Sequence, residues 1–340
     1  MENLVIVPCI SSYYWSQDMN RNVSLDILRI LACIAVITIH TAGSIDFHGL
    51  AEPGSFDWIF GETLDALSRW SVPIFAMLTG VFFLNPQKDI SLKKLYTENI
   101  IRRISVMVFW SIVYSLILKT FIYPMDKSLC GHFWYLGMTI GLYLAMPILR
   151  KIAADDSLLH YFCWVWLGCK VYLFIGKFIV LPFNLYSLLF VDYAGYCLWA
   201  YYLSKIKLQK SYEILLYLFT TIALIITVSA YMITKSATTF WSEYDSVPTI
   251  ITSIGLFYFF SHITIKLPSS NVKWIQNCAQ CTLGIYAVHI LLLTECFTRI
   301  HRFIPSWPIT VIISIVSVFI IGWIITFILK KIPVIGKYIV

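Results

Sequence analysis

The chain is dominated by long apolar blocks separated by short polar segments. Each block approaches the roughly 20 residues that an α-helix needs to cross the hydrocarbon core of a bilayer. Because no water is available there, the backbone of such a block is satisfied as a helix. We therefore predict an all-α, polytopic membrane helix bundle of about ten transmembrane helices. The predicted spans are 25–44, 61–84, 103–122, 133–149, 159–181, 183–203, 212–233, 247–265, 280–298 and 308–329.

Composition and motifs narrow the classes of function. The chain is 59% hydrophobic and 13% charged, whereas a typical soluble domain is about 25% charged. The sequence contains no P-loop, nucleophile elbow, dinucleotide fingerprint or metal-binding cluster, so no metal is predicted. The nine cysteines mostly lie within apolar runs, and we interpret the Cys278–Cys281 pair as structural thiols.

The lysines and arginines predict the orientation of the bundle. They are concentrated at one set of span ends, as the positive-inside rule requires of cytoplasmic ends. Few lie at the opposite ends: Lys127, Lys235, Arg299 and Arg302. The alternation predicts both termini in the cytoplasm and explains the net charge of +7 without nucleic-acid binding. The predicted parts are a cytoplasmic or interfacial lead-in (1–24), a transmembrane domain (25–330) and a cytoplasmic tail (331–340).

The first predicted span carries two ionisable residues. Arg29 and His40 are eleven positions apart, which on an α-helix is about 16 Å along the axis and about 20° in azimuth. Both therefore line one face, with Arg29 near the cytoplasmic end and His40 in the outer half. Ionisable groups within a span are candidates for function. A histidine can take up and return a proton near neutral pH, so His40 is a candidate general base.

Ionisable residues of other spans have both structural and functional interpretations. Asp65 and Arg69 are four positions apart and predict an ion pair on one helix face, although Arg69 can also face the same cavity as His40. Lys170 and Asp192 predict an intramembrane ion pair between the fifth and sixth spans.

Three further ionisable residues lie in or beside the fourth and ninth predicted spans. We interpret His132 as an interfacial residue beside the aromatic belt that follows it. In the ninth span, His289 and Glu295 are candidates for the site. They are six positions apart and therefore face different sides of their helix.

Four segments, in this order and spacing, resemble the acyltransferase-3 family of integral membrane acyltransferases. The first is LDxLR followed by a histidine, with Arg29 and His40 in an Arg-x10-His spacing. VPIFAMLTGVFFL resembles the second-helix pattern, with Thr79–Gly80 in place of Ser-Gly, and LGIYAVHILLL resembles a penultimate-helix Tyr-x-x-His pattern. Tyr96 followed by IIRR resembles a Tyr-then-Arg-Arg segment, although the distance to the arginines departs from the usual pattern.

The resemblance covers nearly the whole chain and implies an activity. Such enzymes are taken to transfer an acyl group, usually acetyl, from cytoplasmic acyl-CoA to a hydroxyl of a cell-surface glycan or lipid-linked sugar outside. It implies that His40 is catalytic and that Arg29 is its charge-positioning partner and contacts the donor. Arg102 and Arg103 are expected to bind donor phosphates. A bacterial plasma membrane is implied as the location.

Two other functions are compatible with the residues. Arg69, His289 and Glu295 are expected to bind substrate, which both an acyltransferase and a small-molecule transporter require. The resemblance extends to membrane domains fused to serine racemases, for which transport of a substrate such as an amino acid has been suggested. The third possibility, a non-enzymatic scaffold, predicts that Arg29 and His40 can be replaced without effect.

Overall fold

The computed structural model describes residues 22–47, 51–88, 90–122, 130–180, 192–234, 240–333 and 335–340. Every regular element in these ranges is a helix. Eight segments are long and apolar enough to cross a membrane: Val23–Gly43, Phe56–Phe83, Leu92–Leu118, Gly131–Ala154, Asp156–Ile175, Lys210–Thr234, Ser269–Phe303 and Trp307–Leu329. The shorter apolar helix Val247–His262 is a ninth. The predicted all-α membrane bundle is confirmed; much of the predicted span 183–203 lies outside the described residues.

The long helices form two compact units, and several helices contribute to both. The helices are α1 (Val23–Phe47), α2 (Phe56–Ser68), α3 (Ser71–Phe83), α5 (Ile101–Leu118), α6 (Trp134–Ala154), α7 (Asp156–Ile175), α8 (Asp192–Lys205), α9 (Lys210–Thr234), α10 (Val247–His262), α11 (Ser269–Phe303) and α12 (Trp307–Leu329). The first unit comprises Met1–Ala32, Arg69–Lys88 and Ile148–Ile275, and the second comprises Cys33–Ser68, Asp89–Pro147 and Gln276–Val340.

The predicted span 61–84 is two helices rather than one. Helix α2 ends at Ser68 and α3 begins at Ser71, so Arg69 and Trp70 form a turn between them. Proline at Pro73 explains the break, because it lacks an N–H and its ring conflicts with the carbonyl four residues earlier, that of Arg69. The spacing of Asp65 and Arg69 predicts that both lie on one continuous helix. That prediction is wrong, because α2 ends before Arg69.

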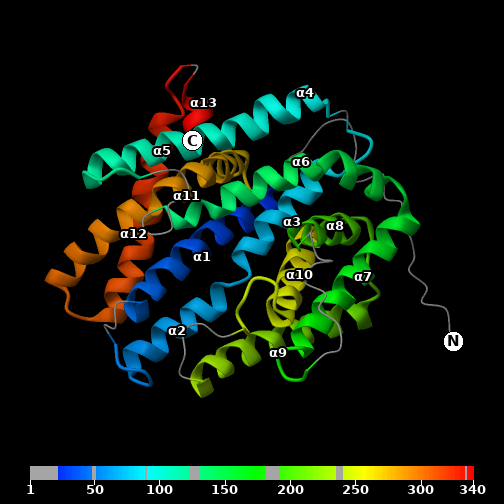
Figure 1. Cartoon of the computed structure of the whole chain (residues 1–340), viewed down its shortest axis with the longest axis horizontal. Helices are drawn as coiled ribbons and strands as arrows, with labels where there is room; N and C mark the ends of the chain where they lie inside the picture. Colours follow the sequence, from blue (N-terminus) through cyan, green and yellow to red (C-terminus); the bar gives the residue numbers. More distant parts are fainter. Residues whose placement is uncertain are drawn as a thin grey trace. The chain divides into compact units, whose positions relative to one another are not determined.

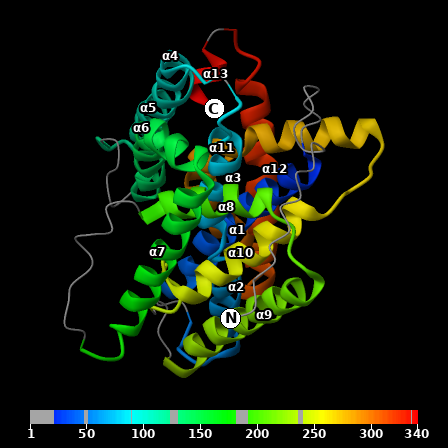
Figure 2. The same cartoon turned by 90° about the vertical axis from the view of Figure 1, so that its right-hand side faces the viewer.

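In the first unit, α3 and α8 lie side by side (Figures 1 and 2), and α9 packs on α10. A glycine permits the close approach of α3 and α8. A Cβ atom on Gly80 would lie 2.2 Å from the carbonyl oxygen of Cys197. The Cys197 thiol in turn donates a hydrogen bond to the carbonyl of Ala76 (3.1 Å). Small side chains here allow the dispersion contacts that hold membrane helices together.

The predicted ion pair between the fifth and sixth spans is confirmed in this unit. The ammonium of Lys170 on α7 lies 2.5 Å from a carboxylate oxygen of Asp192 and 3.3 Å from one of Asp245. The side chain of Lys170 is 2% exposed, whereas those of Asp192 and Asp245 are 52% and 44% exposed. The lysine is thus the buried member of a three-residue ionic group.

In the second unit, α5 illustrates how a membrane helix divides its two faces. Ile104, Val108 and Ile112 are spaced by four residues and are exposed, as expected of a stripe that faces lipid. Trp110 and Tyr114, on another face, are buried. The Trp110 indole donates a hydrogen bond to the carbonyl of Ile339 (2.9 Å), which fastens the short helix α13 (Gly336–Ile339) to α5. Figure 1 shows α13 close to α5.

Candidate functional site

Three histidines from distant parts of the chain meet within the second unit. His40 is on α1, His289 is on α11, and His132 is in the single 3₁₀ turn Gly131–Phe133 that leads into α6. The ring centroids of His40 and His289 are 5.0 Å apart, those of His132 and His289 are 5.2 Å apart, and those of His40 and His132 are 6.4 Å apart. We refer to these three residues as the histidine cluster.

Two tyrosines hold the cluster in place. The Tyr286 hydroxyl on α11 donates a hydrogen bond to the carbonyl of His132, which anchors the 3₁₀ turn. The Tyr114 hydroxyl on α5 donates to the carbonyl of Ala287 (3.3 Å) and accepts from the amide of Leu291 (3.1 Å). These bonds flank His289 along α11, so the backbone that carries its imidazole is tied to α5.

The three imidazoles differ in burial. His40 is half-buried, whereas the exposed fractions of His132 and His289 are 7% and 0%. His40 is therefore the most exposed member of the cluster. Among the residues that the structure describes, the Nε2 atoms of His132 and His289 have no hydrogen-bond partner. Buried polar atoms are nearly always satisfied, so two such nitrogens on neighbouring rings need an explanation.

Sequence reasoning found two of the three members. His40 and His289 had been expected at the site, but His132 had been interpreted as interfacial, whereas it is buried in the cluster. One available signal was depth, because His132, like His40, lies near the outer end of a predicted span. Among the described residues, no group of three or more His, Cys, Asp or Glu side chains is placed to hold a metal ion.

The other first-span candidate has an aromatic neighbour. Helix α1 is continuous through both positions, so Arg29 lies about 16 Å along the axis from His40. The guanidinium carbon of Arg29 lies 5.0 Å from the ring centroid of Phe82 on α3, which is a cation–π arrangement within the first unit.

Arg102 and Arg103 follow a π-helix, Leu95–Ile100, at the start of α5. The Arg102 guanidinium donates hydrogen bonds to the Val340 oxygen from Nη2 (2.6 Å) and Nε (3.1 Å). Arg103 donates to the Tyr143 hydroxyl (2.7 Å) and the Asn99 carbonyl (3.0 Å). Short π-helical segments are frequent at functional sites.

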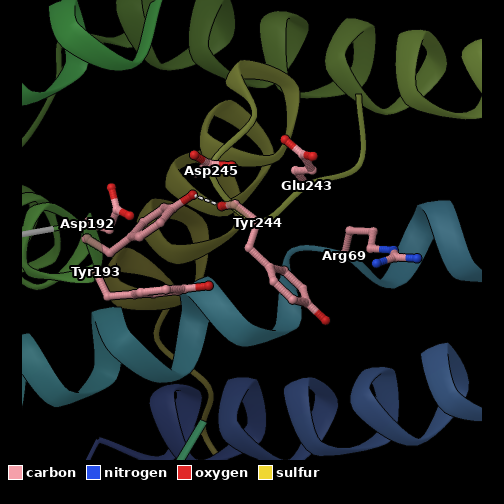
Figure 3. A pocket seen from close by; sticks show the side chains of 7 residues that line it. Arg69, Asp192, Tyr193, Glu243, Tyr244 and Asp245 are labelled. Carbon is pink, nitrogen blue, oxygen red and sulfur yellow. Dashed lines mark hydrogen bonds between the residues drawn. The ribbon is translucent and has the colours of Figure 1, made fainter. Parts of the chain in front are cut away.

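The predicted substrate residue Arg69 lines a polar hollow of about 390 Å³ in the first unit (Figure 3). Its other lining residues are Asp192, Tyr193, Tyr196, Glu243, Tyr244 and Asp245. The Tyr196 hydroxyl donates a hydrogen bond to the carbonyl of Tyr244 (2.5 Å), drawn as a dashed line in Figure 3. The hollow therefore offers a guanidinium, three carboxylates and tyrosine rings, the groups that bind hydroxyl-rich ligands.

Glu295 belongs neither to the histidine cluster nor to the residues that line the hollow around Arg69. Its side chain is exposed, and a carboxylate oxygen accepts hydrogen bonds from Arg299 Nη2 (2.9 Å) and Nε (3.1 Å), one turn later on α11. Such an exposed pair of residues four apart is a common helix-surface feature worth only a few tenths of a kcal/mol.

Comparison with known proteins adds one finding. A family model described as an acyltransferase domain matches residues 22–327, which is most of the chain. No curated protein matches, and no solved structure matches.

Proposed function

The chain belongs to the acyltransferase-3 family of membrane acyltransferases, and on this premise we propose that it is an O-acyltransferase, specifically an O-acetyltransferase, that uses acyl-CoA. The acceptor is a hydroxyl of a cell-surface glycan or lipid-linked sugar on the outer side of the plasma membrane of a bacterium. The observation that carries the proposal is the histidine cluster, in which half-buried His40 contacts two buried imidazoles. Such a group can move a proton away from water.

The chemistry needs one base and one positioned thioester. A neutral His40 removes the proton from the acceptor hydroxyl as its oxygen attacks the thioester carbonyl, and the C–S bond then breaks. The proton passes from His40 to the departing CoA thiolate, which leaves a new oxygen ester and free CoA. In the two-step version, a His40 nitrogen attacks the thioester carbonyl and CoA leaves as the thiolate. The acceptor hydroxyl then attacks the acyl group on His40, the C–N bond breaks, and the hydroxyl proton passes to the CoA thiolate. No metal is required in either route.

The donor site is proposed at the cytoplasmic end of the second unit. Arg103 donates to two neutral oxygens, the Tyr143 hydroxyl and the Asn99 carbonyl, and Arg102 donates to the Val340 oxygen. Exchange of the Arg103 partners for a donor phosphate is favourable because a phosphate is negatively charged and accepts two parallel hydrogen bonds from a guanidinium. We assign Arg29 a charge-positioning role toward the donor, because it lies on the same helix as His40 and at inner depth.

The acceptor is proposed to use the polar hollow around Arg69. Carboxylates and tyrosine hydroxyls accept and donate hydrogen bonds to sugar hydroxyls, and tyrosine rings pack on apolar sugar faces. His289 remains a candidate for the acceptor side of the cluster. Among the predicted substrate-binding residues, Glu295 has the weakest support, because its carboxylate already pairs with Arg299.

The test is transfer of label from radiolabelled acetyl-CoA into a cell-envelope extract by the purified protein. His40→Ala is expected to lower the rate by about 100-fold or more, since general acid–base catalysis contributes about 10²–10⁴-fold. His301→Ala is the matched control, because His301 is on α11 but stacks on Trp307 (3.7 Å between centroids), outside the cluster. No label from a folded wild-type protein, with longer acyl-CoA donors also tried, would refute the transferase and favour transport.

A further inference from the structure

His289 has a defined tautomer because of its hydrogen bond to a carbonyl. Its Nδ1 lies 2.5 Å from the carbonyl oxygen of Tyr286, one turn earlier on α11. A carbonyl oxygen can only accept a hydrogen bond, so Nδ1 must carry the proton. In a neutral imidazole the other nitrogen then has a lone pair. The Nε2 atom of His289 is therefore a hydrogen-bond acceptor.

This acceptor is buried and accepts no hydrogen bond from the residues that the structure describes. The side chain of His289 is 0% exposed, and its Nε2 has no hydrogen-bond partner among the described residues. An unsatisfied buried acceptor costs about 1–3 kcal/mol. Two rings lie beside it, those of His40 at 5.0 Å and His132 at 5.2 Å between centroids. Of these two residues, His40 is half-buried, whereas His132 is buried.

From this geometry we infer that His289 is a positioning residue that sets the tautomer of His40. Its Nε2 accepts the N–H of one His40 nitrogen during the reaction, which leaves the lone pair of the other nitrogen directed to the acceptor hydroxyl. The inference rests on the proposed function. Hydrogen bonds of this kind are often long in a structure without substrate and shorten when the reactants bind.

The arrangement keeps the buried ring uncharged. When His40 takes the hydroxyl proton it has two N–H groups, and the one that faces His289 keeps its acceptor. Charge develops on the half-buried His40, where water and substrate can stabilise it, and His289 stays neutral in the interior. The proton then leaves His40 for the CoA thiolate as the C–S bond breaks, so both imidazoles return to their starting tautomers.

Two amide replacements separate this role from a structural one. His289→Gln places an amide oxygen near the position of Nε2 and retains an acceptor there, whereas His289→Asn places its amide near Nδ1 and retains only the donor to Tyr286. We expect His289→Asn to lower kcat about 100-fold with little change in KM for acetyl-CoA, the loss typical of a misplaced catalytic group. We expect His289→Gln to stay within about tenfold of the wild type.

The opposite order would overturn the inference. If the bond to Tyr286 were the whole role of His289, the asparagine variant would be the more active one. Equal activities of the two variants would also refute it. In a His40→Ala background the two replacements should give the same residual rate, since His289 acts through His40. A wild type without transferase activity, or a fully active His40→Ala variant, would instead refute the proposed function.

A second measurement does not depend on the folding of the asparagine variant. Nitrogen NMR of ¹⁵N-histidine-labelled protein in micelles, compared with His289→Gln, identifies the signals of His289. We expect a neutral ring with its proton on Nδ1. A ring protonated on Nε2, or a doubly protonated one, would contradict the inference.

Discussion

The ionic group of Lys170, Asp192 and Asp245 predicts that removal of the anions is much more harmful than removal of the cation. Lys170 is 2% exposed, and its two partners are 52% and 44% exposed. Replacement of both aspartates by asparagine leaves a charge buried without a counterion, which costs about 3–5 kcal/mol. Lys170→Met leaves two carboxylates that water already reaches and fills the buried volume, so we expect a cost of about 1 kcal/mol or less.

The measurement is equilibrium unfolding of purified protein in mixed micelles with a denaturing detergent. The triple variant completes the cycle: Lys170→Met in the double-asparagine background should recover most of the lost stability, because no buried charge is then left unpaired. The reasoning would be refuted if Lys170→Met alone destabilised the protein as much as the two asparagines, or if the triple variant were the least stable.

Two further predictions concern substrate binding. Arg102→Gln and Arg103→Gln should each raise KM for acetyl-CoA about tenfold or more, as expected for one lost charged hydrogen bond. Arg150→Gln is the comparison. It should lower stability instead, because Arg150 donates to backbone carbonyls of the last residue of α3 and of the loop that follows. Equal KM values for acetyl-CoA in all three variants would contradict the donor site. Arg69→Gln should raise KM for the acceptor about tenfold, whereas Glu295→Gln should not, since its carboxylate pairs on the surface with the next turn of α11. The reverse pattern would place the acceptor elsewhere.

Much of the architecture was predictable because membrane insertion depends on local properties of the chain. A continuous apolar block of about 20 residues has to become a helix in a bilayer, whatever its neighbours are. The same reasoning predicted the pair of Lys170 and Asp192, since a charge inside a span needs a partner and few are available. The break at Arg69–Trp70 was also encoded locally, by Pro73, although the span had been predicted as one helix.

The histidine cluster depended on tertiary structure. Helical periodicity relates residues a few turns apart on one helix, and it placed Arg29 and His40 on one face. It says nothing about which of several helices brings a second or third histidine to the same depth. That choice is made by side-chain packing between α1, α11 and the turn before α6, where bonds from Tyr286 and Tyr114 fix the backbone. The bond from His289 to the Tyr286 carbonyl is local to α11, but only the tertiary structure buries the other nitrogen of that ring beside two further imidazoles.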